Sequence, residues 1–157
     1  MKPDKSADRD IAVNRSARHE YSFDETFETG IVLMGSEVKS LRDGKANIKD
    51  SYARIDGDEV WLMQAHISPY NAASKFGHEP TRVRKLLMHR SEIARLTGKV
   101  KERGLTLIPL RLYFKDGRAK VELGLARGKK QHDKRESIKE REMKREIDRA
   151  VSARNRR

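Results

Sequence analysis

The last 30 residues of the chain, 128–157, cannot form a hydrophobic core, and this limits what the chain can fold into. They contain 12 Lys or Arg and 6 Asp or Glu, so 60% of them are charged, and they contain no aromatic residue. Buried apolar surface must offset the conformational entropy that a chain loses on folding, and this segment has little to bury. We therefore expect a disordered lead over residues 1–10, a folded domain over 11–127, and a separate basic tail over 128–157.

The chain carries a formal net charge of +12, from 36 Lys and Arg against 24 Asp and Glu, and half of it lies in the tail. Such a charge favours a polyanionic partner, because Lys and Arg attract phosphates and release the counterions condensed on them. The charge alone leaves RNA, DNA and an anionic membrane open as partners. A membrane is the weakest of the three, because no stretch approaches the roughly 20 apolar residues that a spanning helix needs.

Cysteine is missing from the sequence, which excludes disulfides and thiolate metal sites. Residues 1–10 alternate Lys, Asp and Arg and lack the apolar centre of a signal peptide. We therefore expect a cytoplasmic protein, because a reducing compartment suits a chain that makes no use of disulfides.

Alternating apolar residues predict a β-hairpin near the end of the domain. Every second residue is apolar in 110–114 and again in 121–125, and the dipeptide Asp116-Gly117 between these runs is a strong hairpin turn. Pro109 cannot donate a ladder hydrogen bond, so we expect either a sheet edge or a bulge at that residue.

A second hairpin is predicted over residues 52–62, with its turn at Asp56-Gly57. Residues 31–33, between two glycines, predict one further short strand. The spacing of Ile93, Leu96 and Val100 predicts a helix that follows these strands. Ser91 is a suitable N-cap for that helix and Gly104 a suitable end.

Two shorter segments also favour helix. Residues 24–29 could form a turn or two before Gly30, and residues 37–42 a short helix that closes near Gly44. Several short strands with a few covering helices predict a mainly β fold with some α. Its expected form is a small oligonucleotide-binding-like β-barrel with two or three flanking helices, which closes its sheet edges and presents a groove.

Reactive side chains do not gather in any known catalytic motif. The five histidines have no metal-ligand spacing such as HExxH, and GxSxG, P-loop and GxGxxG motifs are absent. We therefore predict that the chain is not an enzyme and needs no metal or cofactor. A nuclease whose histidine and carboxylate meet only in the folded protein stays open as an alternative.

Basic clusters are the positive signal in the sequence. Residues 14–19 combine Asn, Arg and His, and residues 82–88 run from Arg82, Arg84 and Lys85 into three apolar residues. RNA-binding proteins pair such donors, which bind phosphates and 2′-hydroxyls, with flat side chains that lie under exposed bases. Glu28 could accept hydrogen bonds from base amino or imino groups, or could simply pair with a neighbouring Arg or Lys.

Taken together, these segments resemble one family: small protein B, the bacterial SsrA-binding protein that partners transfer-messenger RNA. The resemblance runs from about residue 12 to residue 145 and depends on the order and spacing of several motifs. They are Asn14-Arg15-x-Ala17-x-His19-x-Tyr21, Phe27-Glu28-x-Gly30-Ile31, Glu37-Val38-Lys39-Ser40-Leu41-Arg42, Arg84-Lys85-Leu86-Leu87 and Gly128-Lys129-Lys130-x-His132-Asp133-Lys134-Arg135.

The resemblance implies a barrel of oligonucleotide-binding character that binds the tRNA-like domain of transfer-messenger RNA and delivers it to stalled ribosomes in trans-translation. It implies that elongation factor Tu and alanyl-tRNA synthetase act on the same RNA as indirect partners. It places His19 near the ribosomal decoding centre. The residues predicted to contact RNA are Asn14, Arg15, Glu28, Arg84, Lys85 and Leu87. The residues predicted to accommodate the tail on the ribosome are Lys129, Lys130, Asp133, Lys134 and Arg135.

The resemblance also implies a tail that is disordered when free and becomes helical in the empty messenger channel of the small subunit. As a helix the tail would place Met143, Ile147 and Val151 on one face. Its i, i+3 and i, i+4 ion pairs would each contribute only roughly 0.2–0.5 kcal/mol, so the isolated helix is marginal. Some family members carry a bulkier Ile-Met pair where this chain has Ala150-Val151. A general RNA-binding module, such as a ribosome assembly factor, remains the other non-enzymatic alternative.

Overall fold

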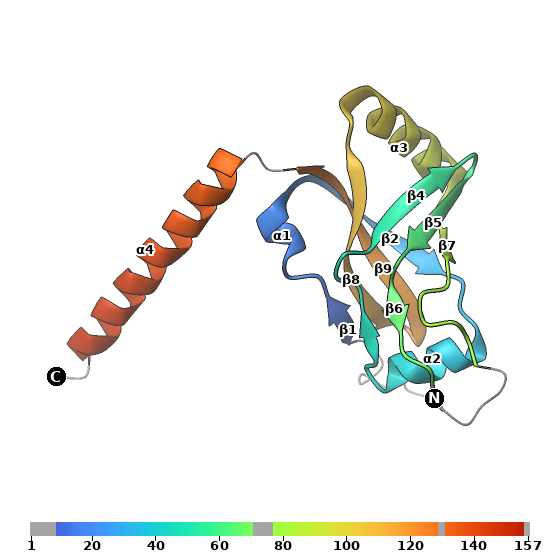
Figure 1. Cartoon of the computed structure of the whole chain (residues 1–157), viewed down its shortest axis with the longest axis horizontal. Helices are drawn as coiled ribbons and strands as arrows, with labels where there is room; N and C mark the ends of the chain where they lie inside the picture. Colours follow the sequence, from blue (N-terminus) through green and yellow to red (C-terminus); the bar gives the residue numbers. More distant parts are fainter. Residues whose placement is uncertain (1–8, 71–76, 129–130, 156–157) are drawn as a thin grey trace.

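The computed structural model describes residues 9–70, 77–128 and 131–155 (Figure 1). Its strands are β1 (Asp10–Val13), β2 (Tyr21–Ile31), β3 (Ala46–Asn47), β4 (Tyr52–Asp56), β5 (Glu59–Met63), β6 (His66–Ile67), β7 (Arg84–Leu87), β8 (Thr106–Lys115) and β9 (Arg118–Gly128). Its helices are α1 (Ala17–Glu20), α2 (Gly35–Arg42), α3 (Arg90–Arg103) and α4 (Gln131–Asn155). Over the described ranges, no helix is both long and apolar enough to cross a membrane.

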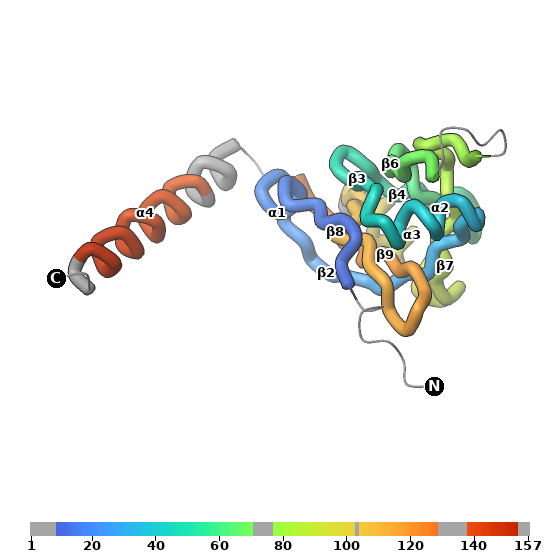
Figure 2. Tube along the Cα trace, turned by 90° about the horizontal axis from the view of Figure 1, so that it is seen from below, coloured from blue at the N-terminus to red at the C-terminus, as the bar shows by residue number. Residues whose placement is uncertain are grey.

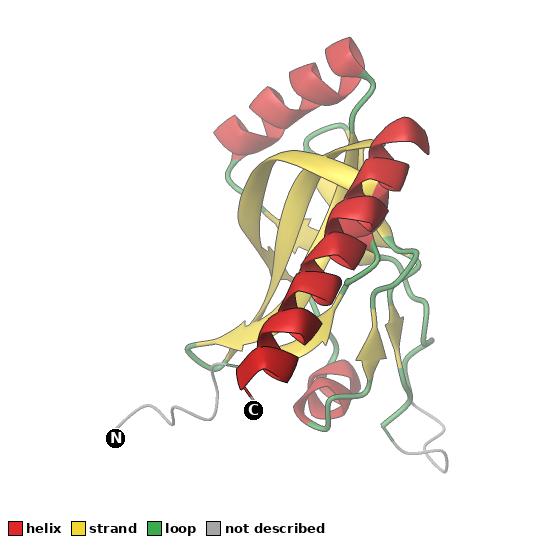
Figure 3. Ribbon diagram, turned by 90° about the vertical axis from the view of Figure 1, so that its left-hand side faces the viewer, coloured by secondary structure: helices red, strands yellow, loops and turns green. Residues whose placement is uncertain are grey.

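The large sheet closes on itself to form a near-barrel ring. Its strands follow the order β8-β4-β5-β7-β2-β9, and β9 pairs back to β8, while β1 extends the sheet from β8. All of these pairings are antiparallel. Figure 3 shows the strands curving around the interior of this ring. The fold is therefore a mixed α/β fold built on a large antiparallel sheet.

Two of the pairings around the ring are short, and we call them seams. At the β4–β8 seam the strands pair at one position, Ala53 with Leu107. At the β2–β7 seam they pair at two positions, Gly30 with Leu87 and Ile31 with Leu86. In the strand order the two seams lie on opposite sides of the ring.

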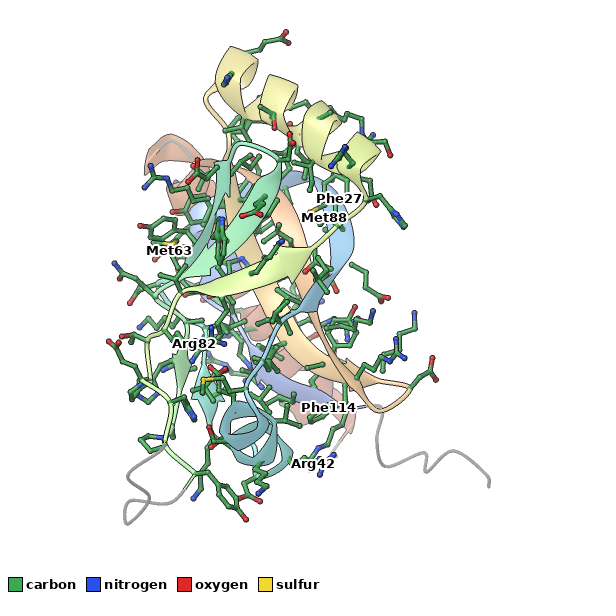
Figure 4. The ribbon with its side chains drawn as sticks, turned by 90° about the vertical axis from the view of Figure 1, so that its right-hand side faces the viewer. Phe27, Arg42, Met63, Arg82, Met88 and Phe114 are labelled. Carbon is green, nitrogen blue, oxygen red and sulfur yellow. The ribbon has the colours of Figure 1, made fainter. Side chains whose placement is uncertain are left out.

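The core fills the ring because each strand presents every second side chain to the interior. Val121, Leu123 and Leu125 of β9 are all 0% exposed. Helices α3 and α2 cover opposite ends of the ring (Figure 1) and contribute Leu96 and Leu41 to the core. Figure 4 shows Phe27 and Met88 toward the α3 end and Phe114 toward the α2 end.

The predicted hairpin of β8 and β9 is confirmed, with nine cross-strand pairs. Its turn residues Asp116 and Gly117 both have positive φ, at 52° and 75°, as a type I′ turn requires. The predicted irregularity at Pro109 is also confirmed, because the register shifts between Pro109 and Arg111. Proline has no N–H to donate to a neighbouring strand, and a bulge accommodates it because the ladder is interrupted at that point.

The other strand predictions need adjustment. The hairpin of β4 and β5 is confirmed, but its turn lies one residue later than predicted, at Gly57 and Asp58. The predicted helix over 24–29 is wrong, because these residues belong to the long strand β2, which also includes the start of the strand predicted over 31–33. Pairing with β9 along most of its length decides this, and local propensity does not.

Two helix predictions are confirmed, but both helices begin earlier than predicted. Helix α2 forms where a helix was predicted over 37–42, although it begins two residues earlier, at Gly35. Helix α3 ends at Gly104, whose φ of 61° places it in the left-handed region. The N-cap of α3 is His89 and not Ser91, which lies inside the helix.

Residues 131–155 form the continuous helix α4, whereas the sequence predicted a tail without structure in the free chain. The helix extends away from the ring and lies beside α1 (Figure 2). Its side chains Met143, Ile147 and Val151 are all more than half exposed. The predicted apolar stripe therefore exists, and it faces solvent.

Candidate nucleic-acid interface

The outer surface of the β2–β7 seam carries two of the predicted RNA-contacting residues on the same face. Gly30 pairs with Leu87, and side chains alternate along a strand, so Glu28 and Gly30 share the outer face with Leu87. A Cβ added to Gly30 would lie 3.2 Å from the Cβ of Leu87. Because Gly30 has no side chain, Leu87 lies across β2 and stays 51% exposed.

Apolar side chains continue along this seam on the same face. Val32 follows Gly30 by two residues, and its amide donates to the carbonyl of Lys85 at 2.9 Å, which extends the pairing. We call this surface the β2–β7 stripe; it comprises Val32, Met34, Val83, Lys85 and Leu87. Its apolar members are 41–51% exposed. Apolar flats beside a cation suit unstacked bases and their phosphates.

Lys85 is the cation of the stripe, and it is only loosely held. Its ammonium lies 3.3 Å from Glu59, and both side chains are well exposed. An exposed ion pair of this kind contributes about 0–1 kcal/mol, so little is lost when Lys85 turns to a phosphate.

Glu28 lies two residues before Gly30 and is held by its neighbours. The Tyr113 hydroxyl donates to its Oε2 at 2.6 Å, and the Lys115 ammonium lies 3.3 Å from the same oxygen. The hydrogen bond from Tyr113 outweighs partial desolvation and, with Lys115, holds the pKa of Glu28 below its ordinary value. Glu28 therefore presents an oriented carboxylate, with acceptor positions left for a base.

A network across three strands keeps Glu28 in this position. The Arg111 guanidinium donates to Glu122 at 2.6 Å and to Asp10 at 2.8 Å, and it lies 4.0 Å from the centre of the Tyr113 ring. These carboxylates raise the pKa of Arg111, whereas burial and the bond to Glu28 raise the pKa of Tyr113. Sequence reasoning missed Arg111 and Tyr113. In β8 they alternate with the core residues Leu110, Leu112 and Phe114, and this alternation is the signal that places them together on the other face of the strand.

Arg84 was predicted to contact RNA, but in the structure it is 0% exposed. Its guanidinium donates to the carboxylate of Glu37 and to the carbonyls of Ala65 at 2.8 Å and Pro80 at 3.0 Å. Glu37 is equally buried, and it also accepts from the Met34 amide at 2.8 Å. Arg84 thus joins β7 to α2 inside the protein and offers no donor to RNA.

Arg82 completes this buried cluster from the surface side. Its guanidinium lies 2.5 Å from Oε1 of Glu37, just before the start of β7 (Figure 4). Burial alone would raise the pKa of Glu37, but the bonds from Arg82, the Met34 amide and Arg84 outweigh it and lower that pKa. The carboxylate is therefore charged at neutral pH.

Asn14 is largely buried, at 6% exposed, and it lines a cavity together with Tyr21 and Tyr52, so its predicted contact with RNA stays a prediction. Its side-chain amide donates to the Pro109 carbonyl at 3.1 Å, and its Oδ1 accepts from Ser16 at 3.2 Å. Asn14 therefore fixes the start of the segment that carries Arg15, which is exposed, against the bulge in β8.

His19 lies apart from the stripe, at the end of α1 near α4. The Arg141 guanidinium donates to its Nδ1 at 2.5 Å, and a cavity of about 220 Å³ opens between them, lined also by Ile138, Glu142 and Arg145. The structure thus brings together His19 and the tail, which are far apart in sequence. The backbone of Asp133, Lys134 and Arg135 belongs to the first turns of α4. Lys129 and Lys130 lie outside the described residues.

In the part of the chain that the structure describes, no group of three or more His, Cys, Asp or Glu could hold a metal ion. What the geometry offers is charge and apolar surface on a small, strongly basic antiparallel near-barrel. Those features define a nucleic-acid-binding protein.

Comparison with known proteins gives the particular family. The family model described as SmpB protein matches residues 11–153. The SsrA-binding protein of Desulforudis audaxviator is 62% identical over 144 residues, which is 92% of this chain and 94% of the relative. That of Syntrophobacter fumaroxidans is 63% identical over 139 residues, 88% of this chain and 86% of the relative. The chain belongs to the SmpB family.

A solved structure agrees with this assignment. A chain described under "tmRNA-SmpB: a journey to the center of the bacterial ribosome" superposes with a TM-score of 0.65 at 47% identity. The superposition covers 84% of this chain and 94% of that chain.

Proposed function

We propose that this chain is the RNA-binding adaptor of trans-translation. In this role it binds the tRNA-like domain of transfer-messenger RNA and delivers it to stalled ribosomes without catalysing a reaction. Membership of the SmpB family is the observation that carries the proposal. The two relatives named above are SsrA-binding proteins, and the match to this chain covers 94% and 86% of their lengths. The adaptor works in the cytoplasm, and elongation factor Tu and alanyl-tRNA synthetase act on the same RNA as indirect partners.

The β2–β7 stripe and Glu28 form the surface that we assign to the tRNA-like domain. Leu87, half exposed beside Gly30, lies under an unstacked base, and Lys85 leaves Glu59 to neutralise a phosphate. Glu28 accepts from a base amino or imino group, because Tyr113 has fixed its carboxylate. Arg15 adds a phosphate contact at the edge of the domain. The ring serves as an oligonucleotide-binding-like barrel, and residues 11–127 form the domain that carries it.

The tail, residues 128–157, has a separate role on the ribosome. The apolar side chains Met143, Ile147 and Val151 of α4 are 52–64% exposed, so the helix gains little from packing against the domain. A helix without such packing is marginal in water, so we expect α4 to be populated in part when free. Inside the empty messenger channel, RNA neutralises its Lys and Arg and the helix becomes stable, with Asp133, Lys134 and Arg135 at its start and His19 beside the decoding centre.

Gel shifts with three RNAs test the role of the domain. The three are a tRNA-like RNA, an unrelated hairpin and a plain duplex, with RNA integrity checked afterwards. We expect clear preference for the tRNA-like RNA and no cleavage. Equal binding of all three would favour a general RNA-binding module, and cleavage would favour a nuclease.

Truncation after Arg127 tests the role of the tail. We expect affinity for the tRNA-like RNA to stay within about twofold, because few phosphate contacts are lost, and peptide tagging on stalled ribosomes to disappear. Equal loss of RNA binding and tagging would refute the division of labour between domain and tail.

A further inference from the structure

A cavity of about 400 Å³ lies at the β4–β8 seam, between β4 and the C-terminal half of α3. Its size falls within the range of ligand pockets, which is about 300–1,000 Å³. Its walls are largely apolar and include Ile55, Val100, Leu105 and Leu107. It lies across the ring from the β2–β7 stripe and so is no part of the surface assigned to the tRNA-like domain.

The backbone of β4 is open toward this cavity. The β4–β5 hairpin has a two-residue turn, so Asp56 and Arg54 bond to β5, and the amide and carbonyl of Ile55 point the other way. On that side β4 pairs with β8 at Ala53 alone among the described residues. The position opposite Ile55 would be Leu105, which comes before β8 begins. Ile55 thus offers one donor and one acceptor to a ligand.

Two cations line the same cavity, Arg54 from β4 and Lys101 from α3, and both are exposed. Neither takes part in any ion pair within the described ranges, in contrast to Lys85, Arg111 and Lys115. Among the described residues that line it, none is Asp or Glu. The cavity is therefore positive, with apolar walls.

We propose that this cavity binds a single unstacked nucleotide. The base lies between the apolar walls with its polar edge on the backbone of Ile55, and its phosphate lies between Arg54 and Lys101. A peptide strand is disfavoured, because it would need a row of free backbone groups where the seam offers those of one residue. The inference goes beyond the proposed function, since it requires neither transfer-messenger RNA nor the ribosome.

Amide chemical shifts of the full chain test this site. The probes are adenosine and uridine 5′-monophosphate, inorganic phosphate, and an unstructured pentaribonucleotide, each titrated separately. We expect both mononucleotides to shift the amides of Ile55 and Leu105 at concentrations where phosphate leaves them unchanged. Tighter binding of the pentaribonucleotide would identify the natural source as an RNA segment, whereas equal binding would identify a free nucleotide; both outcomes support the site. Equal shifts with phosphate, or no shifts with any nucleotide, would overturn it.

Charge reversal supplies the matched control. R54E/K101E should weaken nucleotide binding about tenfold or more, because the phosphate then meets two carboxylates. K45E/K49E changes the net charge equally on exposed residues outside the cavity and should bind as the unmodified chain does. The milder R54Q/K101Q serves if the reversal disturbs the fold, which melting temperature reports. Equal weakening by both reversals would mean that only overall charge matters and would overturn the proposal.

Discussion

At the scale of single residues, two neighbours that look alike in sequence have opposite roles. Arg84 and Lys85 are adjacent, yet Arg84 is fully buried against Glu37 while Lys85 lies outside beside Leu87. Alternation along β7 separates them, because consecutive side chains of a strand point to opposite faces. The basic cluster thus contains one structural cation and one cation available to RNA.

Leu87→Ala tests the apolar contact with RNA. We expect affinity for the tRNA-like RNA to fall about tenfold, because most of the roughly 1.5–3 kcal/mol from burying a leucine is lost. The stability of the free protein should hardly change, since Leu87 is 51% exposed. Val13→Ala, on β1 and 47% exposed, is the control and should leave affinity unaltered. Equal effects of the two substitutions would remove Leu87 from the interface.

Glu37→Gln tests the buried cluster. The substitution leaves Arg84 as a buried charge without its partner, so the free energy of unfolding at neutral pH should fall by about 3–5 kcal/mol. Glu59→Gln, which removes the exposed pair with Lys85, should cost at most about 1 kcal/mol. Urea unfolding measures both, and similar losses would show that burial of the ion pair has no consequence.

The same cluster makes stability depend on pH. The pKa of Glu37 is lower in the folded protein than its ordinary value of 4.5. The stabilisation by its charge is therefore fully present above that ordinary pKa and is lost as pH falls through the folded-state pKa. Urea unfolding between neutral and strongly acidic pH should show a smaller loss of stability for Glu37→Gln than for the unmodified chain; parallel curves would contradict this.

At the scale of elements, the strands depend on partners more than the helices do. Helix α3 ends at Gly104 as its sequence predicts, because a glycine in the left-handed region stops a helix locally. Residues 24–29 were predicted as a short helix and instead form part of strand β2, because β9 pairs with most of that strand. Local signals therefore placed the C-terminal end of α3, whereas the extent of β2 depended on its partner strand.

Two glycine substitutions with opposite expected signs test packing within these elements. A Cβ on Gly124 of β9 would lie 2.5 Å from the Phe23 ring, so Gly124→Ala should destabilise by about 1–3 kcal/mol. A Cβ on Gly98 of α3 meets no atom within 4 Å, so Gly98→Ala should stabilise by up to about 1 kcal/mol. Shifts of the urea midpoint in the same direction would contradict both expectations.

At the scale of the whole molecule, the ring has two weak places, and each coincides with a candidate contact for nucleic acid. The β2–β7 seam carries the stripe, and the β4–β8 seam carries the cavity. Where strands pair briefly, side chains and backbone groups remain open to a ligand. Our two proposals therefore assign nucleic acid to two separate surfaces around one well-packed core.

The net charge of +12 predicts a steep response of RNA affinity to salt. In a plot of log affinity against log salt concentration, each phosphate contact should add roughly −0.7 to −0.9 to the slope, because bound counterions are released. Filter binding at several salt concentrations measures the slope, and Lys85→Ala should make it shallower by about one contact. A flat response would exclude phosphate contacts as the main source of affinity.

The sequence alone determined the features that depend on neighbouring residues. The β8–β9 turn, the end of α3 and the apolar stripe of α4 all follow from local propensity and periodicity, whereas Pro109 predicted either a sheet edge or a bulge. The motifs also indicated the family, because their order and spacing can be recognised without any knowledge of the fold. Exposure of Leu87 and Lys85 was compatible with the sequence but not fixed by it.

Only the tertiary structure decided which polar residues are buried. Glu37 and Arg84 are 47 positions apart and meet inside the protein, and Asn14 reaches Pro109 across 95 positions. No local pattern encodes such pairs, because their burial depends on how the ring closes around them. The same closure left β4 paired with β8 at Ala53 alone among the described residues, beside α3. In the charged tail, periodicity alone predicted the apolar stripe, whereas the tertiary structure left that stripe exposed because α4 extends away from the ring.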